Sequence, residues 1–371
     1  AMSFSGGMLA KLISWSFAPM TALAVYAFVT SRWGSQMAMT SATILFLVPG
    51  VLIAATLTTV DSGVMFYSFL SFSALLSWFK LRQKHWFILS GVFCGLAVGT
   101  KYTAIVVTFL TMEILLVVHE YFVEKRSFFR GAQQAFLFAV FVLCCASPWF
   151  IKNLWYTGNP MYPYFNWIFG SHASQLIEYK HYMLHMNSFF GEFASSDKPW
   201  FNFILPSLKA PWTITMTVNG AAGKTGVLFL LCLPGVFFLK KDRIFCYLLL
   251  IAGCSFWGWV FLLPRELRFV FPIFPPLSIV TAYILWRLPV SSRGRLLIFG
   301  GLGLILLYHL AFLFGVTNVL RPFTYLLGNQ SEEEFLLAHG VNYYPVIQYA
   351  NLEIPENSKI LFVAESRGYY C

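Results

Sequence analysis

Residues 296–316 read LLIFGGLGLILLYHLAFLFGV, 21 residues without an Asp, Glu, Lys or Arg. About 20 predominantly apolar residues are needed for an α-helix to cross a bilayer, so this stretch predicts a transmembrane helix. Nine more apolar runs precede it, and most approach the same length. They are 9–29, 38–58, 62–79, 86–98, 101–119, 132–150, 225–239, 244–263 and 269–286. The sequence therefore predicts an all-α polytopic membrane protein with about ten transmembrane helices.

The composition agrees with this fold class. Hydrophobic residues make up 58% of the 371 residues and charged residues only 11%, whereas a soluble domain has about 25% charged residues. A transmembrane β-barrel is the other structure that can span lipid. Its strands are short and alternate in polarity, unlike these long continuous runs. Helices are therefore expected throughout the membrane region.

The net charge of +10 follows the predicted topology. If the connectors between apolar runs alternate sides, five short connectors on one side hold 13 of the 25 basic residues. These are Arg32; Lys80, Arg82 and Lys84; Lys125, Arg126 and Arg130; Lys240, Lys241 and Arg243; and Arg287, Arg293 and Arg295. Positive charge in short loops marks the cytoplasmic side, so we expect these connectors inside and no nucleic-acid partner.

This topology divides the chain into two parts. Residues 1–317 form a transmembrane module with an external loop at 151–224, and residues 318–371 begin an external C-terminal domain. Residues 332–350 are expected to be a helix and 359–363 a strand, as at the start of a small α/β domain. Six of the seven cysteines lie in apolar runs and predict no disulfide framework. Both ends look cut, so we interpret the chain as a fragment.

Two charged residues stand at the outer ends of apolar runs. Asp61 precedes the run 62–79, where an acidic residue suits either an N-cap or a functional site. Lys101 lies in Gly99-Thr100-Lys101-Tyr102, where it could extend to the lipid headgroups or bind a phosphate. Both interpretations stay open for each residue on this pattern alone.

A polar and aromatic stretch follows the run 132–150. It reads SPWFIKNLWYTGNPMYPY over residues 147–164, and a second cationic turn, PRELR, occupies 264–268. Aromatic rings, amides and cations together suit sugar hydroxyls and a phosphate, and Arg can donate to phosphate through two N–H groups. The alternative is an ordinary interfacial belt with a local Arg–Glu pair. The candidate substrate-binding residues are Lys101, Tyr102, Lys152, Asn153, Tyr156, Asn159, Tyr162, Arg265 and Arg268.

A metal site has only weak support. Glu178, His181 and His185 would share one face of a helix in the external loop, but a wet face of an interfacial helix explains them as well. We therefore assign no metal residues and no certain cofactor, and leave a divalent metal open. Gly-rich nucleotide loops are missing too, so a donor would have to come from the lipid.

Four stretches carry a family resemblance. They are GLAVGTKYTA at 95–104, the stretch from Ser147 to Pro163, RFVFP at 268–272 and AESRGYY at 364–370. In order, they resemble GT-C glycosyltransferases, and most closely the bacterial family related to protein O-mannosyltransferases and to lipopolysaccharide-core galacturonosyltransferases.

This resemblance implies a function and roles. The family moves a sugar from a polyprenyl-phosphate donor to a lipid, glycan or protein acceptor at the outer face, in a bacterial inner membrane. Asp61 matches an auxiliary acidic residue, Lys101 a cation near the carrier phosphate, and Arg268 the basic residue that heads a late span. The main catalytic acidic residue of the family lies in the first external loop, which we expect upstream of this fragment.

Other functions remain as alternatives. A polytopic transporter or lipid flippase is the main one, with a non-catalytic scaffold and an oligosaccharide polymerase or ligase behind it. Transporters typically contain internal repeats and helices broken at mid-bilayer. The polar candidates Asp61, Lys101, Lys152 and Arg268 are expected to line one cavity at the outer face, which favours an enzyme.

The topology can be tested by cysteine accessibility. A cysteine at position 202 should react with an impermeant thiol reagent added from outside, and one at position 84 should react only from the cytoplasmic side. Labelling of position 202 from the cytoplasm alone would refute the assignment.

Overall fold

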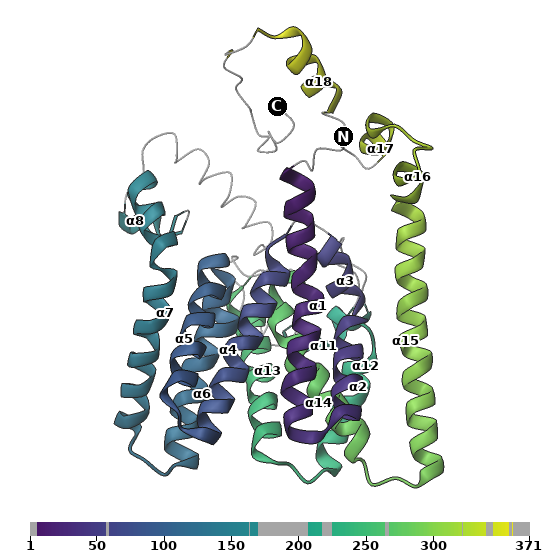
Figure 1. Cartoon of the computed structure of the whole chain (residues 1–371). Helices are drawn as coiled ribbons and strands as arrows, with labels where there is room; N and C mark the ends of the chain where they lie inside the picture. The colour runs from purple at the N-terminus through teal and green to yellow at the C-terminus, as the bar shows by residue number, and fades with distance from the viewer. Residues whose placement is uncertain are drawn as a thin grey trace, which may run out of the picture. The chain divides into compact units, whose positions relative to one another are not determined.

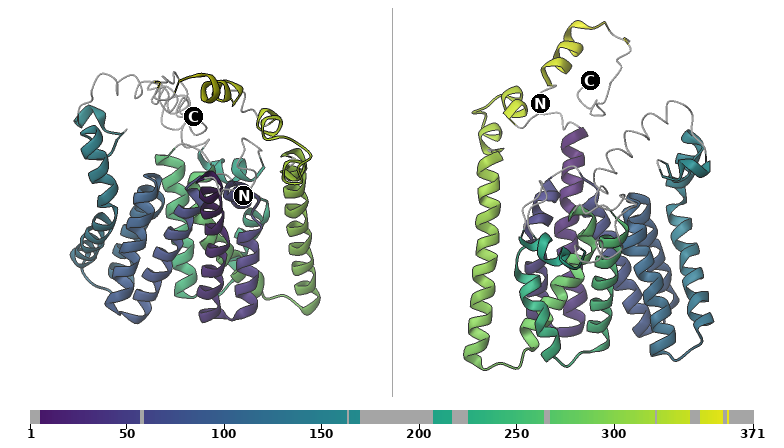
Figure 2. Two further views of the ribbon diagram at one scale, coloured as in Figure 1. Left: turned by 45° about the horizontal axis from the view of Figure 1, so that its top comes forward. Right: turned by 180° about the vertical axis from the view of Figure 1, so that it is seen from behind.

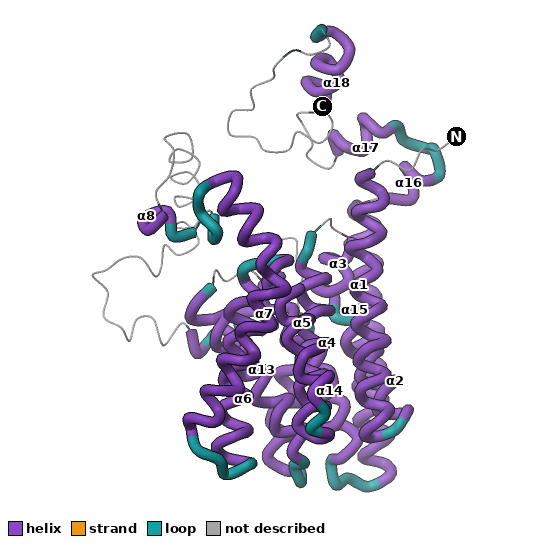
Figure 3. Tube along the Cα trace, turned by 60° about the vertical axis from the view of Figure 1, so that its left-hand side comes forward, coloured by secondary structure: helices purple, strands orange, loops and turns teal. Residues whose placement is uncertain are grey.

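The computed structural model describes residues 6–56, 59–162, 164–169, 207–216, 225–263, 267–320, 322–338, 344–355 and 358. Within these ranges the chain consists of helices and connecting loops, without strands (Figure 3). The chain divides into two compact units, Ala1–His309 and Leu310–Cys371. The all-α prediction is confirmed for the described residues, whereas the expected strand at 359–363 lies outside them.

The first unit begins with five consecutive helical segments. They are α1 (Gly6–Trp33), α2 (Ser35–Phe46), α3 (Pro49–Thr56), α4 (Asp61–Leu81) and α5 (Lys84–Thr100). A span with two π-helical turns follows, formed by η1 (Ile105–Leu110), α6 (Thr111–Val118) and η2 (His119–Val123). Next come α7 (Phe128–Thr157) and the short α8 (Asn166–Phe169).

The second half of this unit completes the bundle (Figures 1 and 2). It contains α11 (Ala210–Met216), α12 (Leu228–Cys232), η3 (Leu233–Phe238), α13 (Arg243–Leu262), η4 (Leu267–Ile273), α14 (Phe274–Arg287) and the start of α15 (Ser292–Leu320). The most enclosed span is η4 with α14, where 83% of an apolar stretch of 18 residues is buried, whereas only 17% of such a stretch in α7 is buried. Residues of α14 therefore form the centre of the core, while α7 offers most of its surface to lipid.

Among the described residues, seven helical spans are long and apolar enough to cross a membrane, or eight if the bent pair α2 and α3 counts as one. The chain is thus a multi-pass integral membrane protein, although ten full spans are not established. Of the remaining runs, α5 has 17 residues and the segment Leu228–Phe238 is shorter still. The run 38–58 is also interrupted, because the chain bends by 59° between Phe46 and Pro49. Proline cannot donate a helical hydrogen bond, which explains the break at this position.

Small residues allow a close contact between α5 and α7. A Cβ added to Gly91 would lie 2.7 Å from Cβ of Phe141, and one added to Gly95 would lie 2.5 Å from Cβ of Cys145. Such glycines let two membrane helices approach closely, and the gain comes from van der Waals packing. They fix α5 against α7, so the outer end of α5 lies beside the last turns of α7.

The basic connectors gather at one end of the bundle (Figure 1). Trp33 Nε1 donates to Asp242 Oδ2 at 2.9 Å and so joins the first connector to the fourth. Arg82 joins the second to the third through 2.9 Å and 2.8 Å contacts with Glu120 and Glu124. The expected alternation of connectors is therefore found in the fold, and the cytoplasmic assignment of this end remains a prediction.

Glu120 is the centre of the ionic cluster at this end. Its side chain is fully buried, and its two oxygens accept from Arg82 and Arg126, both at 2.9 Å. Nearby Glu124 is partly exposed, and the hydrogen bond from Arg82 lowers the pKa of its carboxyl. A lowered folded-state pKa means that Glu124 stabilises the fold above its ordinary pKa and loses this effect as the pH falls through the lowered value.

Replacement of Glu120 should lower the stability of the fold. In Glu120→Gln, two arginines would lose their buried counter-charge, and breaking a buried pair typically costs ~3–5 kcal/mol. The matched variant Glu124→Gln should cost about 1 kcal/mol or less, since its partners remain accessible to water. Thermal unfolding in detergent or nanodiscs measures both, and equal losses would contradict the central role of Glu120.

Candidate active site

Asp61 is the first residue of α4. The residue before it, Val60, makes no side-chain cap, and the Asp61 carboxylate instead turns to another helix. Its Oδ1 accepts a 2.6 Å hydrogen bond from Lys101 Nζ, and its side chain is only 3% exposed. Oδ2 is buried and has no hydrogen-bond partner among the described residues. Asp61 therefore acts as the counter-ion of Lys101 at the positive end of the α4 dipole.

Lys101 directly follows α5. Its backbone is extended, with φ −161° and ψ 134°, so the helix ends here and the side chain leaves the axis of α5. The ammonium group reaches Asp61 rather than continuing along the helix, and the side chain is 23% exposed. An ion pair this short and this shielded from water is worth more than an exposed one, because the effective dielectric constant is lower. The interpretation of Lys101 as a simple headgroup anchor does not fit this contact.

Arg268 joins the pair from the distant segment η4. Both cations lie close to the ring of Phe269: Lys101 Nζ is 4.2 Å and Arg268 Cζ is 5.4 Å from its centroid. A ring face stabilises nearby cations through its quadrupole. Three of the four residues predicted to share one cavity, Asp61, Lys101 and Arg268, are thus brought together. Phe269 was missed, although it stands in the quoted RFVFP motif.

The chemistry of this group favours an anionic ligand. Lys101 and Arg268 bring two permanent cations close to the Phe269 ring. Arg can donate two parallel hydrogen bonds to a phosphate, and the Lys ammonium adds a point charge. A phosphate next to Phe269 would find both.

The fourth predicted residue, Lys152, lies in α7 and is exposed. Its Nζ is 4.3 Å from the centroid of the Trp149 ring, and Trp149 Nε1 in turn donates to Tyr102 Oη at 3.3 Å. Lys152 is therefore connected to the site through Trp149 and Tyr102, and its place in a common cavity stays a prediction. Tyr156 is 75% exposed on the same helix.

The other predicted sugar-binding residues form an internal framework. Asn153 Nδ2 donates to Tyr102 Oη at 2.7 Å, and Tyr102 Oη donates to the carbonyl of Tyr162 at 3.2 Å. Asn159 is fully buried and donates to the carbonyl of Tyr164 at 2.7 Å. A sugar contact for these residues remains a prediction. Arg265 lies outside the described residues, as do Glu178, His181 and His185.

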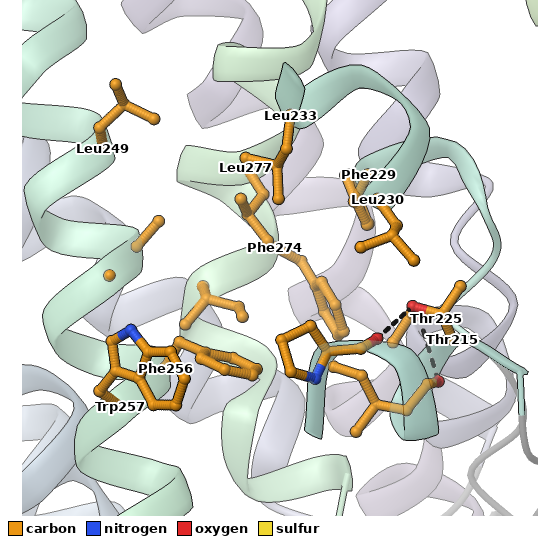
Figure 4. A pocket seen from close by; sticks show the side chains of 15 residues that line it. Thr215, Thr225, Phe229, Leu230, Leu233, Leu249, Phe256, Trp257, Phe274 and Leu277 are labelled. Atoms are coloured by element: carbon orange, nitrogen blue, oxygen red, sulfur yellow. Dashed lines mark hydrogen bonds between the residues drawn. The ribbon is translucent and has the colours of Figure 1, made fainter. Parts of the chain in front are cut away.

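An apolar cavity of about 250 Å³ lies beside η4 and α14 (Figure 4). Its walls come from α11, α12, α13 and α14, and include Phe229, Trp257 and Phe274. The hydroxyls of Thr215 and Thr225 are turned to the carbonyls of Pro211 and Ile214 at 2.7 Å and 3.3 Å. The cavity therefore presents mainly carbon, as a hydrocarbon chain requires.

A second apolar cavity borders the other side of α13 and shares Leu249, Gly253 and Trp257 with the first. Among the described residues, no group of three or more His, Cys, Asp or Glu could hold a metal ion.

The sequence of part of the chain matches the model of one protein family. Residues 8–151 match the family model described as dolichyl-phosphate-mannose-protein mannosyltransferase, a range that includes Asp61 and Lys101. No curated protein matches the sequence significantly.

Two solved structures are similar in fold. One is ArnT from Cupriavidus metallidurans bound to undecaprenyl phosphate, with a TM-score of 0.52 and 17% identity over 80% of this chain and 48% of that one. The other is the same protein in the apo state, with a TM-score of 0.51 and 16% identity over 92% of this chain and 54% of that one.

The chain is a polytopic membrane protein with the GT-C fold. The family match over residues 8–151 and the two structures confirm the resemblance to GT-C glycosyltransferases. The chain spans about half the length of the ArnT structures.

The Asp61–Lys101 pair should show energetic coupling. Asp61→Ala leaves a partly buried ammonium without its counter-ion and should lower stability by ~3 kcal/mol, at the low end for buried pairs because Lys101 retains some water contact. Adding Lys101→Met to Asp61→Ala should recover much of that loss. Thermal unfolding of the two single variants and the double variant measures the coupling, and additive losses would show that the two side chains do not interact.

Proposed function

We propose that this chain is the membrane module of a glycosyltransferase that takes its sugar from a polyprenyl-phosphate donor at the outer face of a bacterial inner membrane. One observation carries the proposal: Lys101, at the end of α5, is paired with Asp61 of α4, and Arg268 of η4 lies close to the same Phe269 ring as Lys101. By the predicted topology, these ends all lie on the outer side. The acceptor is a lipid, glycan or protein.

The donor class is supported by two separate features. The cations match a phosphate, and the apolar cavity beside η4 offers a place for the start of a hydrocarbon chain. An amphiphilic donor needs both, with its phosphate near the interface and its tail in the lipid. The ArnT structure bound to undecaprenyl phosphate shows that this fold can hold such a carrier.

The cations have a defined task in this reaction. In an inverting displacement the acceptor attacks the sugar carbon while the bond to the carrier phosphate breaks, and a carboxylate, expected in the family's first external loop, takes the acceptor's proton. Negative charge then grows on the leaving phosphate, and Lys101 and Arg268 stabilise it by preorganised electrostatics. Asp61 Oδ1 is already bonded to Lys101, so its role is to hold that cation in place.

A transporter or lipid flippase is the second candidate, and one feature favours it. The 59° break between α2 and α3 resembles the discontinuous helices of transporters. Proteoliposome flux assays with a labelled polyprenyl-phosphate lipid separate the two functions. Movement of the lipid without sugar transfer would favour the flippase.

Lys101→Ala and Arg268→Ala should each impair transfer from a polyprenyl-phosphate sugar while the protein stays folded. Loss of one such electrostatic contact typically costs ~3–4 kcal/mol, or roughly a hundred- to a thousandfold in rate. The assay is transfer of radiolabelled sugar in proteoliposomes that contain the full-length protein.

The matched control is Lys80→Ala, because Lys80 is exposed at the opposite end of the bundle and should leave transfer unchanged. Normal turnover in both site variants would remove the phosphate-binding role. Activity with a nucleotide sugar would overturn the donor class.

A further inference from the structure

In the turn after α5, the neighbouring side chains of Lys101 and Tyr102 point in different directions. Lys101 N donates to the carbonyl of Ala97, while Ala104 N and Ile105 N donate to the carbonyls of Lys101 and Tyr102, so the turn is bonded to helices on both sides. The backbone of Lys101 is extended, and successive side chains of extended backbone point in opposite directions. Lys101 accordingly reaches α4 and Asp61, whereas Tyr102 reaches α7 and the loop after it.

The Tyr102 hydroxyl is fully occupied by protein groups. It accepts from Asn153 Nδ2 at 2.7 Å and from Trp149 Nε1 at 3.3 Å, and it faces the carbonyls of Tyr162 and Pro160 at 3.2 Å and 3.4 Å. One donor and two acceptor positions are all that a phenol offers. Burial raises the pKa of Tyr102, which keeps the hydroxyl proton in place as a donor.

The segment that Tyr102 contacts is itself fixed. Gly158 ends α7 with φ 71°, a left-handed conformation that favours glycine. Asn159 then closes the turn, since its Oδ1 accepts from Met161 N at 2.9 Å and its Nδ2 donates to the carbonyl of Tyr164. The Tyr164 ring packs edge-on against Tyr102, with centroids 5.5 Å apart. The start of the external loop therefore forms a defined wall against Tyr102.

From this geometry we infer that Tyr102 is the positioning residue for Lys101, and that it couples the start of the external loop to the Lys101–Asp61 pair. A lysine side chain has about 2 kcal/mol of rotamer entropy, so the ion pair depends on a fixed backbone to aim it. The hydrogen bonds of Tyr102 supply that anchor from the other side of the turn. A ligand that moves the wall at 158–162 would then also move Lys101. The catalytic consequence rests on the proposed function, while the coupling itself does not.

The coupling can be measured without any enzyme activity. Competitive labelling with a water-soluble amine reagent in detergent, followed by mass spectrometry, compares Lys101 with the exposed Lys80 at the opposite end of the bundle in the same molecule. The neutral amine is the nucleophile that attacks the reagent, so the ion pair with Asp61 protects Lys101. Tyr102→Phe keeps the ring contacts with Tyr164 and Phe150 and removes the hydroxyl. It should raise Lys101 labelling by roughly three- to tenfold, the factor for about one lost hydrogen bond.

Two further variants complete the design. Asn153→Leu removes the strongest donor to Tyr102 and should raise Lys101 labelling in the same direction, which keeps the test decisive if Tyr102→Phe does not fold. Tyr121→Phe is the control, since Tyr121 is an exposed tyrosine in η2, and it should change nothing. Unchanged Lys101 labelling in the folded variants, or an equal rise at Lys80, would overturn the inference.

A transfer assay extends the test to catalysis. If Tyr102 acts through Lys101, Tyr102→Phe should slow transfer in the natural background and have no further effect in Lys101→Ala. If the fold-changes in transfer rate caused by Tyr102→Phe and Lys101→Ala multiply in the double variant, Tyr102 has a separate role and the positioning role is overturned. Increased Lys101 labelling in a protein without any transferase activity would instead refute the proposed function and leave the coupling standing.

Discussion

The ion pair between Lys101 Nζ and Asp61 Oδ1, at 2.6 Å, is the contact on which the site depends. Both groups belong to helix ends at the membrane surface, where a lone lysine would extend into the headgroup region. The buried carboxylate of Asp61 prevents this and holds the ammonium against Phe269. Arg268 reaches the same ring from η4. The ion pair thus joins the ends of α4 and α5, and the Phe269 ring brings the two cations together.

The rest of the bundle serves this arrangement by fixing helix ends. Glycines 91 and 95 let α5 pack closely on α7, which brings Tyr102 to Trp149 and Asn153. The enclosed segment η4 with α14 carries Arg268 and Phe269 into the bundle. At the opposite end, Glu120 and its two arginines bind the connectors together. The site is therefore held at both ends of the spans that form it.

Much of this arrangement could be predicted from sequence, because the bilayer imposes a simple geometry. Apolar runs of fixed length alternate direction, so the sequence alone predicts Asp61, Lys101 and Arg268 at the same face of the membrane. Sequence could not give the partners of polar groups, since a hydrogen bond depends on rotation and depth as well as on the side of the membrane. Tyr102 and Asn153 thus looked like ligands for a sugar and proved to be bonded to each other. The break at Pro49 had a visible signal, whereas the π-helical turns at η1 and η2 had none.

The central claim is that Lys101 and Arg268 jointly bind the phosphate of a polyprenyl carrier. An electron cryo-microscopy structure of the full-length protein in nanodiscs with undecaprenyl phosphate tests it most directly. We predict phosphate oxygens within about 3 Å of Lys101 Nζ and of the Arg268 guanidinium, the range of N–H···O hydrogen bonds. The hydrocarbon tail should enter the cavity beside η4. A phosphate bound away from both cations, with Lys101 still paired only to protein groups, would contradict it.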